Sequence, residues 1–349
     1  MSARDEPATA AHTSANTDAS VSATAGEAFL RAFVARAGAS KVLGYQAFVD
    51  LALFDPEVGY YMQSRPRIGY GTGTDFFTAS TSGPVFGELV VAACRHRLGA
   101  ADPTQYTFVE IGAESDGGIL AEVKHPFGAV KTVRLGQTLD LSGRCVVFSN
   151  ELFDAQPFRR FRYRNTHWVE LGVALQGDRL HEVELAEVEG PMGPLILPDA
   201  APPGYTLDAP ISAVKLLGAI VRQPWSGLFV AFDYGKTWRE LIEACPAGTA
   251  RAYFRHTQTN DLLARPGQQD LTCHVCWEWL EGALAEARFT SVSVDTQESF
   301  FIRNAESYIA AAIAADAATL TARKQSLLQL LHGAHLGQKF QVLHGRREA

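Results

Sequence analysis

Three short apolar segments of the chain each end in a cluster of polar residues or glycine. The segments at 106–111, 145–148 and 228–232 are rich in Val, Ile, Leu and Phe, as buried strands are. The residues that follow are Gly112 after the first, Asn150 and Glu151 after the second, and Asp233-Tyr234-Gly235 after the third. Open α/β sheets bind ligands at the carboxyl ends of their strands. The pattern therefore predicts an α/β sheet with its chemistry at those ends.

The remaining segments predict helices around this sheet and a separate β-rich section. Apolar residues recur at helical spacing in 27–37, 45–54, 83–98 and 307–332, which makes the amino-terminal region helical. Strands are expected at 130–135, 291–296 and 338–344. Between 159 and 225, strand patterns at 168–175 and 179–188 precede a Pro-rich connection at 191–210. We interpret 159–225 as an inserted β-rich substrate lobe within a domain that spans 26–349.

Residues 1–25 differ from the rest because they hold almost no large apolar side chain. Such a segment cannot offset its ordering entropy by burial, so a disordered tail is expected. Asp5, Glu6 and Asp18 argue against an organelle transit peptide, and the tail lacks the apolar core of a secretory signal. No apolar stretch approaches the roughly 20 residues that span a bilayer. We expect a cytoplasmic protein without a membrane partner.

Charge and cysteine content narrow the classes of function. The net charge of −7 gives no basic surface for nucleic acid, so no nucleic-acid partner is expected. Five cysteines in 349 residues do not make a disulfide framework. Cys273 and Cys276 form a C-x-x-C, but no second cysteine pair accompanies them, and no metal site is predicted. His256 and His274 are either general bases or hydrogen-bonded structural residues. The sequence does not say whether the chain forms a homodimer.

Two of the polar clusters suggest specific ligands. Glu110, Gly112 and Gly118 form a strand-to-helix turn in which the backbone can approach a nucleotide-like ligand, although such turns also occur without one. Asn150, Glu151 and Asp154 follow the next strand. Asp154 could be a helix cap and Asn150 a turn residue. Two carboxylates and an amide together can also hold a guanidinium, which matches paired carboxylates in charge and geometry.

Taken in order, the motifs resemble those of the MidA-like methyltransferases, which include the mitochondrial complex I assembly factor with arginine methyltransferase activity. They are FDPEVGYY at 54–61, DFFTAS at 75–80, PVFGEL at 84–89, VEIGA at 109–113, SNELFDAQPF at 149–158, FDYG at 232–235, GTARAYFRH at 248–256, PGQQDLTCHV at 266–275 and LGQKFQVL at 336–343. Their order and spacing cover nearly the whole chain after about residue 40, and NELFDAQP and DPEVGYY are the most specific.

The resemblance implies a Rossmann-like class I methyltransferase fold with a seven-stranded sheet and S-adenosyl-L-methionine as the methyl donor. The acceptor would be the arginine side chain of a protein. The residues that would bind the donor are Asp75, Phe76, Thr78, Glu110, Gly112 and Ala113. Asn150, Glu151 and Asp154 would be the catalytic residues, beside the transferring methyl group and the acceptor.

The donor-binding region departs from the family pattern in two ways. Glu114 occupies a position where family members usually carry a glycine. Only 40 residues separate Glu110 from Asn150, with one strand candidate between them, where the family core has two. The acid that holds the ribose of the donor has no clear counterpart, although Asp140 is a candidate. Besides an active arginine methyltransferase, two alternatives stay open: a scaffold or assembly factor without donor binding, and a small-molecule enzyme that reuses the groove.

Overall fold

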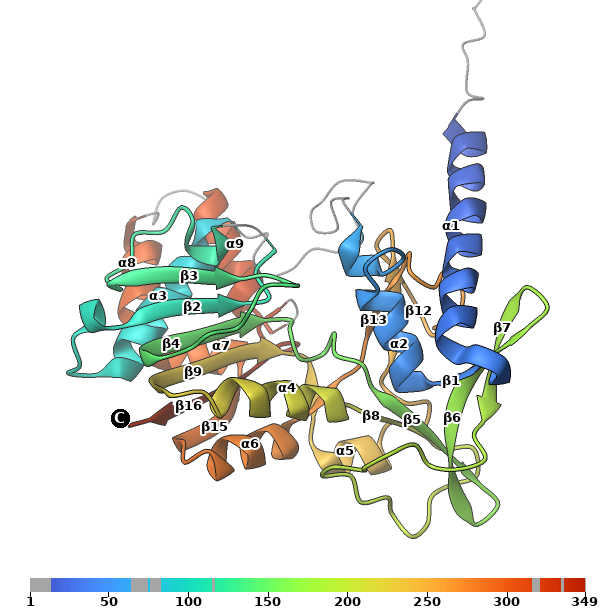
Figure 1. The fold of residues 1–349 in the computed structure, drawn as a ribbon. Coiled ribbons are helices and arrows are strands. Elements are labelled where there is room, and N and C mark those ends of the chain that lie inside the picture. Colours follow the sequence, from blue (N-terminus) through green and yellow to red (C-terminus); the bar gives the residue numbers. More distant parts are fainter. Residues whose placement is uncertain are drawn as a thin grey trace, which may run out of the picture.

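The computed structural model describes residues 14–63, 75, 83–114, 117–315, 321–333 and 336–348, with the backbone alone for 14–25. Within this part of the chain, two bodies of secondary structure lie side by side (Figure 1). One is a large sheet covered by helices, and the other is a lobe of smaller sheets and the amino-terminal helices. Phe76 and Thr78, which we expected at the donor site, lie outside the described residues.

The large sheet has six strands in the order β15-β16-β9-β4-β2-β3. Its four parallel strands are β3 (Ala129–Val133), β2 (Thr107–Ile111), β4 (Gly143–Asn150) and β9 (Trp225–Asp233). The two others are β16 (Gln341–Arg347), which runs antiparallel to β9, and β15 (Thr290–Thr296), which pairs with β16. The predicted α/β class is confirmed, and so are the three strands that end in polar clusters.

Helices cover both faces of this sheet, and the alternation of side chains along each strand decides which face they contact. On one face lie α3 (Pro84–Leu98), α7 (Gln297–Asn304), α8 (Glu306–Ala315) and α9 (Ala322–Leu331), and on the other lie α4 (Ile211–Val221) and α6 (Trp277–Glu286). Phe148 packs in the hydrophobic core beneath α3, α7, α8 and α9, whereas its neighbour Val147 packs in the core beneath α4 and α6. The expected single helix at 307–332 is thus two helices, α8 and α9.

The sheet is shorter than the seven strands that the family resemblance implies. Between β3 and β4 the chain forms only a loop at 134–142, and between β2 and β3 it forms one short turn, η5 (Gly118–Leu120). A crossover connection between parallel strands needs about a dozen residues or more, so the loop at 134–142 has no room for a further strand with its own helix. The seven-stranded expectation is therefore wrong, and β3 becomes an outer edge of the sheet.

The lobe assembles from three separate parts of the chain. Its larger sheet has the order β1-β6-β5-β8, with β7 against β6, where β1 is Val42–Gly44, β5 Arg159–Arg164, β6 His167–Gln176, β7 Arg179–Glu184 and β8 Thr206–Ala209. Its smaller sheet has the order β12-β11-β13, made of Thr257–Thr259, Arg251–Phe254 and Asp270–Thr272. The predicted section at 159–225 includes α4, which packs on the main sheet instead. The inserted strands end at Ala209.

The amino-terminal helices belong to the lobe. Helix α1 (Ser14–Ala37) leads through η1 (Gly38–Ser40) and β1 into α2 (Tyr45–Phe54) and η2 (Tyr60–Met62). Phe29 and Phe33 anchor α1 in the lobe core, and its first turns extend away from the body of the molecule (Figure 1). The disordered tail expected at 1–25 is therefore helical from Ser14 onward. Alanine, common in this segment, has the highest helix propensity, and an anchored helix propagates easily.

Short elements join the two bodies. They are β10 (Gly235–Lys236), which pairs in parallel with β14 (Val275–Cys276), and helix α5 (Trp238–Glu243), whereas the turn η4 (Pro103–Gln105) connects α3 to β2 within the main body. Helix α5 begins with a capping box in which Thr237 and Glu240 satisfy each other's backbone amides. In the described part of the chain, no helix is long and apolar enough to cross a membrane.

A buried ion pair ties the lobe together. Arg159 on β5 donates two hydrogen bonds of 2.6 Å to the carboxylate of Glu170 on β6, and both side chains are almost fully buried. The same carboxylate accepts the backbone amide of Glu189 at 2.7 Å, and Arg159 also donates to the carbonyl of Pro191. The pair therefore holds the connection after β7 against the sheet.

We expect Glu170→Ala to lower the free energy of unfolding by about 3–5 kcal/mol, because it leaves the Arg159 guanidinium buried without its partner. The matched control is Glu184→Ala, which breaks the half-exposed Arg164–Glu184 pair on the neighbouring strands of the same sheet. That change should lower the free energy of unfolding by about 1 kcal/mol or less. Urea unfolding of the three proteins measures both effects. Equal losses in the two variants would contradict a special role for the buried pair.

Candidate functional site

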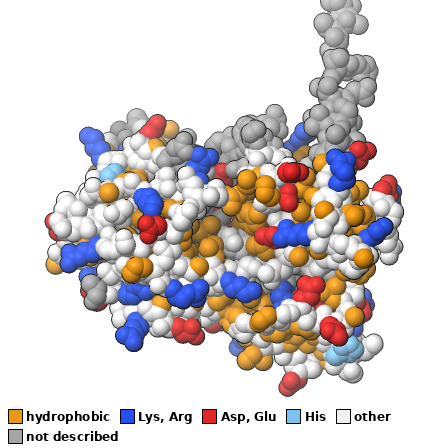
Figure 2. All heavy atoms as spheres, in the orientation of Figure 1, with side chains coloured by type: hydrophobic (Ala, Val, Ile, Leu, Met, Phe, Trp, Pro, Cys, Tyr) orange, Lys and Arg blue, Asp and Glu red, His pale blue; other side chains and the backbone are white. Residues whose placement is uncertain are grey.

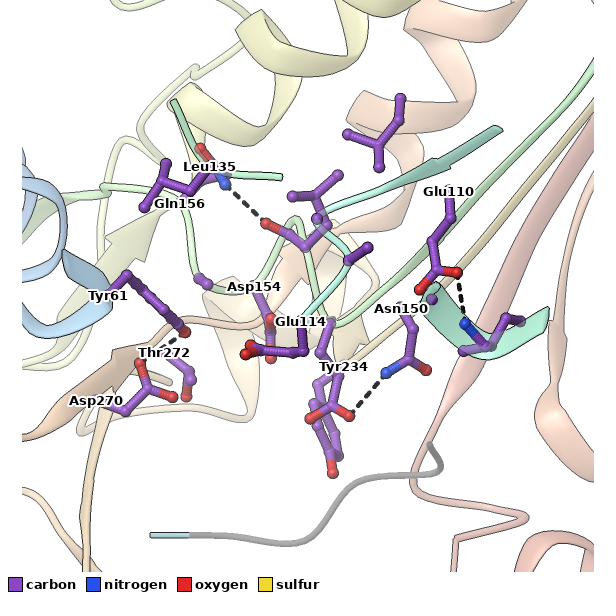
Figure 3. A pocket seen from close by; sticks show the side chains of 18 of the residues that line it. Tyr61, Glu110, Glu114, Leu135, Asn150, Asp154, Gln156, Tyr234, Asp270 and Thr272 are labelled. Atoms are coloured by element: carbon purple, nitrogen blue, oxygen red, sulfur yellow. Dashed lines mark hydrogen bonds between the residues drawn. The ribbon is translucent and has the colours of Figure 1, made fainter. Parts of the chain in front are cut away.

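A cavity of about 1660 Å³ lies at the carboxyl ends of β2, β4 and β9, between the main sheet and the lobe. In Figure 2 the surface is recessed where the two bodies meet, and Figure 3 shows the side chains that line the cavity. Typical sites for one small ligand have roughly 300–1,000 Å³. This cavity therefore has room for a cofactor together with part of a second molecule.

The turn after β2 forms one wall of the cavity. Gly112 and Gly118 both have positive φ angles, +82° and +57°, which favour glycine. A Cβ atom built on Gly118 would lie 2.1 Å from Oε2 of Glu110. That same oxygen accepts the backbone amide of Ile119 at 2.8 Å. Glu110 and Gly118 therefore fix a close-packed turn, and Glu110, Gly112 and Ala113, which we expected to bind the donor, all line the cavity.

Burial changes the acid–base behaviour of Glu110. Its side chain is only 6% exposed, and no charged partner compensates for the lost hydration. This burial raises the pKa of Glu110 to about 7, and the hydrogen bond from Ile119 opposes the shift only in part. Glu110 thus titrates near neutral pH in the ligand-free protein.

The end of β3 forms the next part of the wall. Residues 133–137 line the cavity, with Arg134 and Gln137 as the polar side chains. The Gln137 side chain accepts the backbone amide of Arg134 at 2.8 Å, which closes a tight turn. Asp140, our candidate for holding the ribose of the donor, is exposed and does not line the cavity. Its backbone carbonyl accepts a hydrogen bond from Lys131 instead.

The loop after β4 brings the three predicted catalytic side chains into the same cavity. Glu151 has φ of +52°, a left-handed conformation that is strained for a residue with a side chain, and its amide donates to the carbonyl of Phe232 at 2.8 Å. The Asn150 amide donates to the Glu151 carboxylate at 3.0 Å (Figure 3). Burial and the nearby Asp154 raise the pKa of Glu151 well above its usual value.

A second carboxylate group comes from the lobe. Asp270 on β13 accepts a hydrogen bond of 2.9 Å from the Tyr61 hydroxyl, and burial raises its pKa to about 7. Burial, Asp233 and Asp270 raise the pKa of Asp154 well above its usual value. In Figure 3 Asp154 and Asp270 approach the cavity from different elements, one from the main sheet and one from the lobe. The cavity thus gathers carboxyl groups that repel one another when ionised.

Aromatic and imidazole rings complete the wall. Tyr234 and Tyr253 line the cavity, and Tyr234 packs on Phe340 with ring centroids 4.2 Å apart. His274 also lines the cavity, and burial lowers its pKa to about 4, so its ring is neutral at pH 7. His256 lies at the rim with an exposed side chain. The sequence motifs included Tyr234, Tyr253 and Asp270, but none of the three was among the predicted site residues.

Asp75 lines the cavity but also serves the architecture of the lobe. Its carboxylate accepts the Tyr60 hydroxyl at 2.7 Å and the Arg255 amide at 2.8 Å, and its carbonyl accepts the His256 amide. Cys273 and Cys276 have different partners: Cys273 lies 3.6 Å from the Thr249 hydroxyl, and Cys276 contacts Glu278. The C-x-x-C pair therefore belongs to the packing around β13 and β14.

Comparison with known proteins gives the family. The sequence model of a family described as "Putative S-adenosyl-L-methionine-dependent methyltransferase" matches residues 96–294, more than half of the chain. The chain belongs to this methyltransferase family. Its methyl donor is therefore S-adenosyl-L-methionine. No protein with a curated description matches the chain significantly.

Solved structures agree on the fold of this methyltransferase. One solved structure, from Burkholderia thailandensis, is described as a superfamily member and "likely methyl transferase" bound to S-adenosyl-homocysteine. It matches this chain with a TM-score of 0.79 at 20% identity, and the match covers 94% of each chain. A native structure of an uncharacterized protein of that superfamily, from the same organism, has a TM-score of 0.75 at 19% identity and covers 94% of this chain and 93% of that one.

The cavity fits the donor on two grounds. The glycine turn at 112–118 has no room for a Cβ at Gly118 and has an exposed backbone at Gly112, which lets a ligand approach the main chain closely. The carboxyl group of Glu110 lies on the same wall, where the positive charges of the donor gain from negative charge, whereas Glu114 would repel the carboxylate of the donor.

We expect the methyltransferase to lose stability as the pH rises from 5 to 8, in part through Glu110. Its pKa is about 7 when folded and 4.5 when unfolded, so in this window the folded state keeps a proton that the unfolded state has lost. Glu110→Gln removes this contribution, on the order of 2–3 kcal/mol. Urea unfolding of the ligand-free proteins at several pH values measures the slope. Identical slopes in both proteins would contradict the raised pKa.

Proposed function

We propose that this protein transfers a methyl group from S-adenosyl-L-methionine to the arginine side chain of a protein, as MidA-like enzymes do. The observation that carries the proposal is the common cavity. It joins the glycine turn after β2 to the carboxyl groups of Glu151, Asp154 and Asp270. Leu152 links the two sides, because its Cδ1 atom would lie 3.0 Å from a Cβ on Gly112. The donor turn and the acceptor loop therefore pack directly on each other.

The carboxyl groups match a cationic acceptor. Without one, burial and mutual repulsion raise the pKa of Glu151 and of Asp154 and so disfavour their ionised forms. A guanidinium that enters compensates for the repulsion and favours the ionised carboxylates. The bound donor supplies an electrophilic methyl group on a sulfonium. The enzyme's own part is to orient the acceptor nitrogen and to accept the proton that this nitrogen loses.

The rings of the cavity wall support the same acceptor. Tyr234 and Tyr253 offer aromatic faces, on which a guanidinium stacks favourably. Neutral His274 adds no repelling positive charge. A protein that presents an arginine is the partner we propose. The acidic lining, like the net charge of −7, disfavours nucleic acid.

The abridged donor region supports the second candidate, a scaffold or assembly factor that does not bind the donor. The sheet lacks one strand at the β3 edge, and Arg134 is at the end of β3, where dinucleotide-binding folds usually place an acid. Residues 134–137 would then have to hold the ribose without a carboxylate. Donor binding separates the two candidates.

We expect the wild-type protein to bind S-adenosyl-homocysteine with micromolar affinity, and Gly118→Ala to weaken this binding at least tenfold. The new Cβ would meet the Glu110 carboxylate and would also strain a positive φ. Isothermal titration measures the affinity. Gly282→Ala on α6, where a Cβ meets no atom within 4 Å, is the control that should bind normally. Folded wild-type protein that binds no ligand at millimolar concentration would favour the scaffold.

We expect Glu151→Gln and Asp154→Asn to lower methyl transfer to arginine at least a hundredfold, because each removes a negative charge from the acceptor site. The affinity for S-adenosyl-homocysteine should change less than threefold. The assay uses an arginine-containing peptide library with methyl-labelled donor, followed by amino-acid analysis for methylarginine. Label on another residue type, with donor binding intact, would contradict the arginine acceptor. Transfer only to small molecules would favour an enzyme of different substrate class.

A further inference from the structure

Asp233, the last residue of β9, is a buried carboxylate that does not line the cavity. Its side chain has no exposed surface. Its Oδ1 atom accepts the backbone amides of Phe153 at 3.1 Å and Asp154 at 2.9 Å. It therefore lies behind the loop that presents the predicted catalytic side chains, and it contacts that loop through the main chain.

These two bonds complete a set that fixes the course of the loop. The amide of Glu151 donates to the carbonyl of Phe232, and the carbonyl of Asp154 accepts the amide of Cys273 at 2.8 Å. Between these points Glu151 takes its left-handed conformation. Without Asp233, two buried amides would lose their acceptor, and the strained turn would lose its main support.

Asp233 also faces the side chain of Asp154. Each carboxyl group affects the ionisation of the other, and Oδ1 of Asp154 is buried without a hydrogen-bond partner. The other titratable groups that face this pair are Glu151 on the same loop, Tyr61 on η2, Tyr234 after β9, Tyr253 on β11, and Asp270 and Cys273 on and after β13. None of these carries a positive charge. A second carboxylate behind Asp154 therefore opposes its ionisation until a cation enters the cavity.

We propose that Asp233 is a positioning residue, which fixes the Asn150–Asp154 loop through the amides of Phe153 and Asp154 and, as a second carboxylate behind Asp154, opposes the ionisation of that side chain until the acceptor cation arrives. This inference rests on the proposed acceptor role of Asp154. The carboxylate of Asp233 thus has two separate effects. The oxygen that accepts the amides sets the geometry, and the negative charge sets the proton on Asp154.

Asp233→Asn tests the charge separately from the geometry. Its side-chain oxygen still accepts the two amides, and its NH₂ group donates toward Asp154 instead of repelling it. In protein labelled with ¹³C at the aspartate carboxyl carbon, the Asp154 signal is identified by its loss in Asp154→Asn. We expect this signal to titrate about one to three pH units lower in Asp233→Asn than in the wild type. A purely structural role would leave the titration unchanged.

Asp208→Asn is the matched control. Asp208 is equally buried and accepts two backbone amides, those of Thr249 and Ala250, but it lies in the lobe and pairs with Arg160. Its substitution should leave the Asp154 titration in place. Asp233→Ala removes the geometry as well, and should weaken S-adenosyl-homocysteine binding at least tenfold through the Leu152–Gly112 contact, whereas Asp233→Asn should keep it within threefold.

The outcomes distinguish this inference from the proposed function. An Asp154 signal that titrates at the same pH in the wild type and in Asp233→Asn, while both proteins bind S-adenosyl-homocysteine, overturns the role of Asp233 alone. Wild-type protein that does not bind this ligand overturns the proposed function, and the role inferred for Asp233 with it. A lowered titration in a variant that binds the ligand normally supports both.

Discussion

The site depends on one requirement: the chain must leave the sheet after β4 and still satisfy every buried peptide group. β4 ends at Asn150, and the next residues turn away into the cavity between the two bodies. The lost strand pairing is replaced by the Phe232 carbonyl, the Asp233 carboxylate and the Cys273 amide. β9 and the segment after β13 therefore determine where Glu151 and Asp154 lie. The arrangement of the site follows from this hydrogen bonding more than from the loop sequence itself.

The local sequence was sufficient to locate the residues that lie at the ends of the central strands. Buried strands followed by Gly112, Asn150 and Asp233 correctly located the three central strands and the edge of the sheet that carries the cavity. Glu110, Gly112, Ala113, Asn150, Glu151 and Asp154 all line it. Each of these positions depends on a pattern within about ten residues, which is the range over which strand and turn preferences act.

What the sequence did not reveal depends on contacts between distant residues. Asp75 joins Arg255, and Tyr61 joins Asp270, through hydrogen bonds that close only when the lobe assembles from three parts of the chain. The boundary of the insertion was placed too late because α4 is amphipathic in either setting, and only its packing against α6 assigns it to the main sheet. Asp233 belongs to a polar cluster at the end of a strand in the sequence, and only the structure shows that its carboxylate accepts backbone amides inside the protein. Such roles can be identified only from the three-dimensional structure.

The carboxyl groups of the cavity affect the stability of the ligand-free site and the choice of the acceptor that we propose. Glu110, Asp233 and Asp270 have pKa values of about 7, and the pKa values of Glu151 and Asp154 are raised as well. The ligand-free site therefore favours the protonated forms of these carboxyl groups. Each added negative charge costs stability in the absence of a cation. A cation that fits recovers this energy, whereas a neutral side chain of similar size does not. A lysine offers a compact point charge, whereas a planar guanidinium presents its donors in a fixed fork that matches the geometry of carboxylates. The placement of Asp154 and Asp270 on two different bodies of the protein is consistent with the arginine acceptor that we propose.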